Sequence, residues 1–375
     1  MTTAGVLVGC QLASGAHVPA LATPARLLSV RQVAIASPAT LVAAVTGASS
    51  LNETDRRWQI KGTDLGILWE GSSGDILAAF GDTFGSRWSG HGSVGTPAAN
   101  GWRSNTLARS DDRDLADGMT VDSFTHDTPG QARELLGSQK VDGGEMTVVP
   151  TAGIAVDGRD YVHYMSVQHW ITHGRWTTNH SGIAWSDDGG ETWVKDPDAR
   201  WPNRAGAGDT FQMAAFARSD GYVYVFGTPS GRGGDVRLAR VPEHELLVPD
   251  AYRYWDGVAW SPSIGDAQPI VPAPVGEMSV QFNAYLGQWT MLHVVSPADD
   301  DVRSIVLRSA NRPTGPWSPP QVLATSDEHP GLYGGFIHPW SASSGDAELY
   351  FTMSLWEPYN VYLMRTTVSP QPAVR

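Results

Sequence analysis

The sequence predicts an all-β fold, a five-bladed β-propeller, and three observations support this class. Glycine (41 residues) and proline (25) are frequent in the 375-residue chain, which favours many short strands joined by turns over long helices. Five similar units follow one another at intervals of roughly 40–80 residues. The chain also contains a turn sequence that is typical of propeller blades. Together these features indicate radial repetition of small antiparallel sheets.

Residues 1–50 differ in composition from the rest. They are rich in Ala, Ser, Thr, Val and Pro and contain no acidic residue. Because they show no strand or helix period, we predict an export remnant or linker, poorly ordered or loosely attached, followed by a propeller over residues 51–375. Leu7-Val8-Gly9-Cys10 is similar to a bacterial lipobox but lacks the usual basic segment before it. The expected location is secreted or envelope-associated, with acylation of Cys10 as one alternative.

Each of the five units contains a strongly β-prone second strand and a third strand that ends in a polar turn. The predicted second strands are Asp75–Phe80, Tyr161–Val167, Tyr222–Phe226, Trp289–Val295 and Glu348–Ser354. The predicted third strands are Trp102–Ser110, Gly182–Ser186, Val236–Val241, Ser304–Ser309 and Val361–Thr366.

A turn motif between two of these strands supports the propeller class. Ser186 to Trp193 matches the S-x-D-x-G-x-T-W pattern of the Asp-box, which joins outer strands of propeller blades. Its aspartate is expected to cap backbone amides of a tight turn, and its tryptophan to pack beneath that turn. A degenerate counterpart runs from Arg308 to Trp317. The motif predicts fold and carries almost no information about function.

Acidic residues precede the innermost strand of four units. Asp64, Glu145, Asp209 and Glu277 each stand just before an apolar run, and the fifth unit supplies His338 instead. Since inner strands of a propeller begin at one end of its channel, these side chains are expected around one mouth. A structural role, or a channel cation such as calcium, is an alternative for any single one of them.

Asp82 strengthens the catalytic interpretation of Asp64. Gly71-Ser72-Ser73-Gly74 predicts a hairpin turn between the first two strands. That hairpin would bring Asp64, before the first strand, beside Asp82, after the second, with backbones ~5 Å apart. Two such carboxyl groups can cleave a glycosidic bond, one as acid and the other as nucleophile or base. Retention and inversion of configuration both stay open.

Several polar and aromatic residues are candidates for contact with a sugar, although blade packing is the alternative role for each tryptophan. The candidate substrate-binding residues are Trp102, Arg103, Asn105, Glu145, Trp170, Asp209, Gln212, Glu277, Gln281, His338 and Trp340, and Trp356 is a further stacking candidate.

Composition excludes several function classes. The formal net charge of −13, without a basic stripe, argues against nucleic-acid binding. A single cysteine permits neither an intrachain disulfide nor a cysteine-based metal site. No apolar run approaches the roughly 18–20 residues that span a bilayer. We therefore expect a monomer that acts on polysaccharide and requires neither a cofactor nor a metal.

The order of six short motifs resembles the actinobacterial endo-D-arabinanases, glycoside hydrolase family 183. The resemblance covers roughly residues 55–370. The motifs are Thr63-Asp64-Leu65-Gly66, Phe80-Gly81-Asp82-Thr83-Phe84-Gly85, Trp102-Arg103-Ser104-Asn105, Pro150-Thr151-Ala152-Gly153-Ile154, Tyr254-Trp255-Asp256-Gly257 and Tyr333-Gly334-Gly335-Phe336.

This resemblance implies endo-hydrolysis of α-D-arabinofuranosyl linkages in the D-arabinan of mycobacterial arabinogalactan and lipoarabinomannan. It implies Asp64 as nucleophile or base and Asp82 as acid. A propeller that only binds glycan, as a lectin or adhesion module, is an alternative. So is a propeller hydrolase of another furanoside or pentose polysaccharide, such as L-arabinan or xylan. A sialidase is disfavoured, because the Asp-box alone supplies neither its three arginines nor its tyrosine nucleophile.

Overall fold

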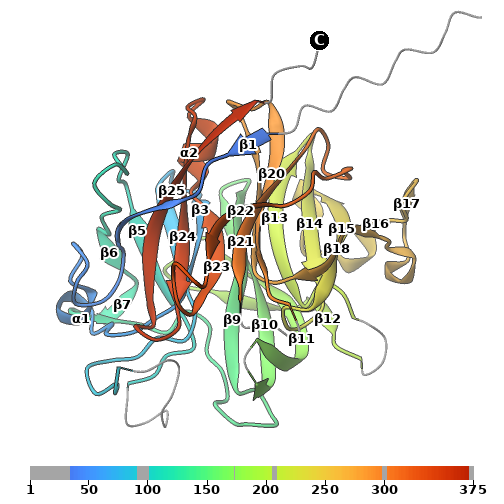
Figure 1. Cartoon of the computed structure of the whole chain (residues 1–375). Coiled ribbons are helices and arrows are strands. Elements are labelled where there is room, and N and C mark those ends of the chain that lie inside the picture. Colours follow the sequence, from blue (N-terminus) through green and yellow to red (C-terminus); the bar gives the residue numbers. More distant parts are fainter. Residues whose placement is uncertain (1–33, 91–100, 173, 205–208, 298–301, 371–375) are drawn as a thin grey trace, which may run out of the picture. The chain divides into compact units, whose positions relative to one another are not determined.

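A computed structural model describes residues 34–90, 101–172, 174–204, 209–297 and 302–370 (Figure 1). Five small sheets are arranged as the blades of a β-propeller, as the sequence predicts. The innermost strands contact one another in cyclic order, from the first blade through the fifth and back to the first. Every second and third strand predicted from the sequence is present. In the second blade the strands are longer than predicted, because Arg159–Thr172 replaces Tyr161–Val167 and Arg175–Ser186 replaces Gly182–Ser186.

The first two blades contain four strands each. The first consists of β3 (Leu65–Glu70), β4 (Ile76–Phe80), β5 (Thr106–Ser110) and β6 (Ser123–Phe124). The second consists of β9 (Thr147–Val156), β10 (Arg159–Thr172), β11 (Arg175–Ser186) and β12 (Val194–Pro202). Outside these sheets lie the hairpin of β7 (His126–Thr128) and β8 (Gln131–Ala132) and the helix α1 (Thr54–Arg57).

The remaining blades follow the same antiparallel order. The third contains β13 (Met213–Ser219), β14 (Tyr222–Thr228) and β15 (Gly234–Pro242), with β16 (Arg253–Trp255), β17 (Trp260–Ser261) and β18 (Pro269–Val275) at its outer edge. The fourth contains β19 (Met278–Asn283), β20 (Gln288–Val295), β21 (Ser304–Ala310) and β22 (Gln321–Thr325). The fifth contains β23 (Leu332–Ile337), β24 (Glu348–Leu355) and β25 (Asn360–Pro370), and α2 (Pro339–Ser343) follows β23.

Two strands from the start of the described chain complete the fifth blade. The strand β1 (Ala34–Ala36) pairs with β25 from Ala34 opposite Pro370, and β2 (Thr40–Ala44) pairs with the same strand (Figure 1). The propeller therefore begins before residue 51, and residues 34–44 are not a loosely attached linker. Residues 1–33, including the lipobox-like segment with Cys10, lie outside the described residues.

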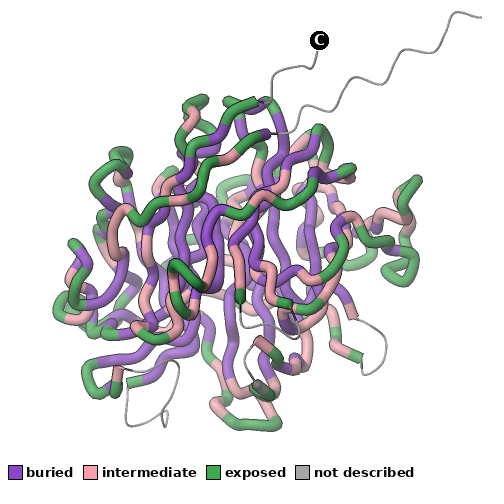
Figure 2. Tube along the Cα trace, in the orientation of Figure 1, coloured by how far each residue is buried: buried purple, intermediate pink, exposed green. Residues whose placement is uncertain are grey.

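Both faces of each blade are covered by its neighbours, so the middle strands are largely buried. All five residues of β4 are buried, and buried backbone dominates the strands while exposed backbone marks the connecting loops (Figure 2). The hairpin between β3 and β4 turns at the predicted glycines, where Gly74 has φ +87° and the N–H of Gly71 donates to the carbonyl of Asp75 at 2.8 Å. A side chain is disfavoured at such a φ.

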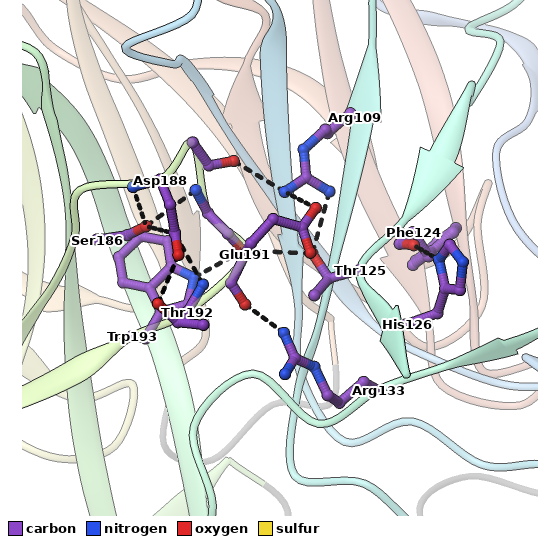
Figure 3. Close-up of polar contacts among 12 residues, drawn as sticks. Arg109, Phe124, Thr125, His126, Arg133, Ser186, Asp188, Glu191, Thr192 and Trp193 are labelled. Atoms are coloured by element: carbon purple, nitrogen blue, oxygen red, sulfur yellow. Dashed lines mark hydrogen bonds and ion pairs between the residues drawn. The ribbon is translucent and has the colours of Figure 1, made fainter. Parts of the chain in front are cut away.

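The Asp-box forms the turn between β11 and β12 and has the predicted structural role (Figure 3). Asp188 accepts bonds from the N–H of Thr192 at 2.8 Å, the hydroxyl of Thr192 at 2.6 Å and the hydroxyl of Ser186 at 2.7 Å. Trp193 Nε1 donates to the carbonyl of Gly190 at 3.0 Å. Arg109 of the first blade forms an ion pair with Glu191, so the turn also ties two blades together.

The degenerate motif lies in the equivalent turn between β21 and β22, two blades further on. Trp317 Nε1 donates to the carbonyl of Pro313 at 3.3 Å, as Trp193 does in the complete motif. None of the helices in the described part of the chain is long and apolar enough to cross a membrane.

Candidate active site

A cavity of about 590 Å³ lies where the innermost strands begin. Its floor receives one apolar side chain from the innermost strand of each blade. These five residues, which we call the apolar floor, are Leu65, Val149, Met213, Met278 and Phe336. All five are less than 10% exposed. This volume is in the range of small-molecule sites, and an apolar floor disfavours charge on any carboxyl group above it.

Asp64 and Asp82 both line this cavity. Asp64 immediately precedes β3 and Asp82 follows β4 by two residues, and the N–H of Gly81 donates to the carbonyl of Asp64 at 3.1 Å. The hairpin therefore brings the two aspartates together as its sequence indicates. A bulge between Leu65 and Ile67 accompanies the turn, with Leu65 at φ +69°. Positive φ in a leucine is strained backbone, which is common at functional sites.

The two oxygens of Asp64 differ in their partners. The Tyr333 hydroxyl donates to Oδ2 at 2.9 Å, and the hydroxyl of Tyr359 also contacts this carboxyl group. Oδ1 is buried and has no hydrogen-bond partner among the described residues. It lies over the backbone of Gly81, where a Cβ atom would stand 2.3 Å from it. Glycine at position 81 thus provides the space for Oδ1.

Asp82 is 7% exposed and accepts two hydrogen bonds on one oxygen. Trp102 Nε1 donates to Oδ1 at 2.9 Å, and the hydroxyl of Thr147 donates to the same atom at 2.7 Å. Trp102 comes from the loop before β5, and Thr147 is the first residue of β9. Donors of this kind favour the ionised form of a carboxyl group.

These surroundings separate the pKa values of the pair. Burial and then the charge of Asp82 raise the pKa of Asp64 to about 8, against the opposing hydrogen bonds from Tyr333 and Tyr359. Burial raises the pKa of Asp82 to about 6, against the hydrogen bonds from Thr147 and Trp102. Asp82 loses its proton first, so Asp64 titrates beside a negative charge. Near pH 7 the pair therefore consists of a protonated Asp64 and an ionised Asp82.

A buried ion pair also lines the cavity. Arg232 Nη2 lies 2.6 Å from Glu277 Oε1, and Arg232 Nε lies 2.9 Å from Oε2. Burial acts to raise the pKa of Glu277, but the charge and hydrogen bonds of Arg232 outweigh it and lower that pKa. Glu277 lines the cavity as predicted, but it is ionised and paired, so it does not supply a proton there.

The predicted ring of charged side chains around the channel mouth is only partly present. Glu145 turns along its own blade, where it accepts from the Ser166 hydroxyl at 2.7 Å. Asp209 accepts from the N–H of Arg204. His338 follows the end of β23 and is buried, but it does not line the cavity. Glu145 and Asp209 do not line it either, whereas Asp64 and Glu277 do.

Four other residues that were predicted to contact the substrate form hydrogen bonds within the propeller instead. Arg103 donates to two backbone carbonyl groups, and burial lowers its pKa to about 10. Asn105 bridges backbone groups of two segments, Gln212 bonds to Thr178 and a carbonyl group, and Gln281 donates to a carbonyl group of β23. These side chains do not line the cavity, so its geometry adds no support to their predicted roles.

The predicted tryptophan platforms separate into two groups. Trp170 and Trp356 line the cavity, and Trp170 is 39% exposed. Trp102 contacts the aspartate pair through Asp82 instead. Trp340 belongs to α2, outside the cavity lining, where the guanidinium of Arg113 stacks 3.2 Å from its ring centre.

Sequence reasoning did not identify Tyr333, Tyr359, Arg232 or Thr147 as site residues. Tyr333 stands in one of the six ordered motifs, which was the only signal for it. Tyr359 and Arg232 lie in loops far from the aspartates in sequence, so nothing local connects them to the site. Among the residues that the structure describes, no group of three or more His, Cys, Asp or Glu side chains is placed to hold a metal ion.

The fold and the site define a β-propeller with a pair of carboxyl groups suited to acid–base chemistry. The chain belongs to the family described as Domain of unknown function (DUF4185), which matches residues 49–365. A relative named Notoamide biosynthesis cluster protein J, from Aspergillus sp. (strain MF297-2), is 35% identical over 81% of this chain and 82% of that protein. The family's description names no activity, and the expected relationship to D-arabinanases stays a prediction.

Solved structures share the fold at low sequence identity. A provisionally named hydrolase from Bacteroides ovatus ATCC 8483 has a TM-score of 0.55 and 14% identity, covering 84% of this chain and 87% of that one. Propeller glycoside hydrolases are also among the similar structures, such as a GH43 endo-arabinanase from Bacillus licheniformis with a TM-score of 0.44, 14% identity, and coverage of 84% and 96%. At this identity the similarity concerns the fold alone.

Proposed function

We propose that this protein is a glycoside hydrolase that cleaves α-D-arabinofuranosyl linkages within D-arabinan, such as that of mycobacterial arabinogalactan and lipoarabinomannan. The observation that carries the proposal is the pair Asp64 and Asp82, which line one cavity with pKa values of about 8 and about 6. Glycosidases need one carboxylic acid and one carboxylate at the same pH. The identity of the sugar rests on the resemblance of the six sequence motifs.

The pKa order assigns the two roles. Asp64 keeps its proton near pH 7, so this carboxyl group donates the proton to the oxygen of the departing group. As the bond between that oxygen and the anomeric carbon breaks, Asp82 attacks the carbon or takes a proton from the attacking water. This assignment is opposite to the one that the family resemblance implies.

The mechanism needs no further proton carrier. If Asp82 forms a covalent ester with the sugar, the ionised Asp64 then takes a proton from the water that hydrolyses the ester. If Asp82 acts as base, the water oxygen bonds directly to the anomeric carbon and inverts its configuration. The configuration of the first product, followed by NMR, distinguishes these two routes.

The test is release of oligosaccharides from purified mycobacterial arabinogalactan, with L-arabinan and xylan as comparison substrates. We expect new reducing ends from D-arabinan, and a loss of roughly 10²–10⁴-fold in rate in Asp64→Asn and Asp82→Asn, because each removes an acid–base group. Asp250→Asn, in the short 3-10 helix Pro249–Ala251 on the surface, is the control. Full activity in both aspartate variants would remove the proposed site, and cleavage of L-arabinan or xylan alone would reassign the substrate.

A glycan-binding propeller without catalysis is the competing function. It predicts saturable binding of D-arabinan and no new reducing ends at any pH between 5 and 9. The separated pKa values of Asp64 and Asp82 favour catalysis, since binding alone requires no acid beside a carboxylate.

Because the proposed substrate belongs to the cell envelope, the protein would act outside the cytoplasm. We therefore propose a secreted or envelope-associated monomer.

A further inference from the structure

The hairpin of β10 and β11 carries apolar side chains beyond the edge of its blade. The strand β9 pairs with β10 only as far as Val167, and β12 pairs with β11 only from His180 onward. The end of the hairpin therefore extends as two strands alone. It carries Trp170, Ile171 and Trp176, which line the cavity and which we call the apolar wall.

The apolar wall contains two exposed side chains. Trp170 is 39% and Ile171 is 53% exposed, whereas Trp176 is buried and packs edge-on against Trp170 with ring centres 5.5 Å apart. Exposure of apolar side chains to water is unfavourable in free energy, and a ligand that covers them removes this cost. Their position at a cavity indicates that the ligand of this cavity covers them.

The apolar wall lies on the side of the acid. The guanidinium of Arg232 stands 5.4 Å from the ring of Trp176 and 5.2 Å from the ring of Tyr333. Tyr333 in turn donates to Asp64 Oδ2. The N–H of Arg232 also donates to the carbonyl of Gly174, which anchors the end of the hairpin at 3.2 Å. A group that receives its proton from Asp64 is therefore released next to the apolar wall.

Two polar groups near the wall are already engaged, whereas Trp176 Nε1, within the wall, has no hydrogen-bond partner among the described residues. The guanidinium of Arg232 is held by Glu277, and the Thr151 hydroxyl lies 2.5 Å from His163 Nδ1. A sugar ring bound here would place several hydroxyl groups against apolar side chains, where an unmade hydrogen bond is costly. An aromatic or alkyl group would instead bury apolar area, which makes the free energy of binding more favourable.

We propose that the leaving-group side of this cavity holds a subsite for an apolar group, so that the protein binds the glycoside of a benzyl or other apolar alcohol more tightly than the methyl glycoside of the same sugar. This inference rests on the proposed glycosidase and names the chemistry of its leaving group. Cleavage of D-arabinan and preference for an apolar leaving group are separate properties, and each can be measured without the other.

Binding to the Asp64→Asn variant tests the inference without interference from turnover. Benzyl and methyl α-D-arabinofuranoside, and the corresponding L-arabinofuranosides, are titrated calorimetrically; their leaving alcohols have similar acidity but very different apolar area. We expect the benzyl glycoside to bind roughly tenfold tighter or more, because its ring is buried on the apolar wall. Trp170→Ala and Ile171→Ser should each bring the ratio of the two dissociation constants towards one.

Phe282→Ala is the matched control, since Phe282 is 48% exposed on β19 outside the cavity, and it should keep the full benzyl preference. Equal binding of the benzyl and methyl glycosides, or no binding of either, overturns the inference. So does a preference that persists unchanged in both wall variants. Release of fragments from D-arabinan by the wild-type protein tests the proposed function separately, so the two can fail independently.

Discussion

The carboxyl groups of Asp64 and Asp82 have different pKa values because their neighbours differ. The activity should therefore depend on pH. Activity should rise as Asp82 ionises near pH 6 and fall as Asp64 loses its proton near pH 8. The Tyr333 hydroxyl lowers the pKa of Asp64, so Tyr333→Phe should move the alkaline limb to higher pH and leave the acid limb in place. The measurement is kcat/KM from pH 5 to 10.

Tyr285→Phe controls for the loss of a tyrosine hydroxyl, because Tyr285 is 41% exposed and does not line the cavity. A profile of Tyr333→Phe that coincides with the wild-type profile would show that Asp64 does not set the alkaline limb. A change that appears in kcat/KM only as a uniform loss at every pH would indicate a purely structural role for Tyr333.

Gly81 provides the space in which the carboxyl group of Asp64 lies. A Cβ atom at this position would stand 2.3 Å from Asp64 Oδ1, so Gly81→Ala should push the carboxyl group out of place and reduce kcat roughly 100-fold. The measurement is kcat together with the melting temperature. Gly137→Ala is the control, because a Cβ there meets no atom within 4 Å. An active Gly81→Ala protein would contradict the proposed position of the acid.

Single residues of the site were predictable only where a local pattern pointed to them. Asp64 and Asp82 are joined by a hairpin whose turn and strands are visible in the sequence, so their proximity followed from short-range geometry. Tyr333 reaches Asp64 across 269 residues of chain, and Arg232 reaches the cavity from a loop of the third blade. Such contacts depend on how blades meet, which one blade's sequence does not contain.

At the scale of elements, the Asp-box turn joins two strands and also two blades. Asp188→Ala removes three hydrogen bonds from this turn and should lower the free energy of unfolding by about 1–2 kcal/mol. Enzyme kinetics should not change, since the turn lies outside the cavity lining. Chemical denaturation measures the stability change.

The neighbouring aspartate offers a matched control for this prediction. Asp187 bonds to Arg159 on the exposed surface, so Asp187→Ala should cost less stability than Asp188→Ala. Equal losses in the two variants would mean that the capping hydrogen bonds of Asp188 do not stabilise the turn.

Strands were more predictable than the directions of their side chains. Strands such as β4 and β24 are apolar runs bounded by turn residues, and both faces are buried between blades, so residue type alone reveals them. The side chains at the starts of inner strands depend on local backbone, as the bulge at Leu65 shows. The near-copies Glu145-Met146 and Glu277-Met278 illustrate this, because only the second glutamate lines the cavity.

At the scale of the whole molecule, closure of the ring depends on pairing between the two ends of the described chain. A chain that starts at Val45 should melt at a lower temperature than one that starts at Ala34, because it lacks β1 and β2 and uncovers the edge of β25. Thermal denaturation and light scattering of these two proteins check this. Identical melting temperatures and no association would show that closure contributes little.

The sequence of residues 34–44 gave no sign of this role, because strand pairing over such a separation leaves no local pattern. Five of these eleven residues are alanine, and such a composition is compatible with a linker as well as with an edge strand. Only the outer edge of β25 in the assembled propeller, opposite β24, identifies the partner.

This closure also constrains how the protein is made on the ribosome. The hydroxyl of Thr366 donates to the carbonyl of Ser37, 329 residues earlier in the chain. At 5–20 residues per second, the segment around Ser37 waits roughly a quarter of a minute to a minute for its partner. Four blades can assemble during that time, but the fifth becomes complete only after β25 has been made. Chaperones that shield nascent β-strands would therefore act longest on β1 and β2.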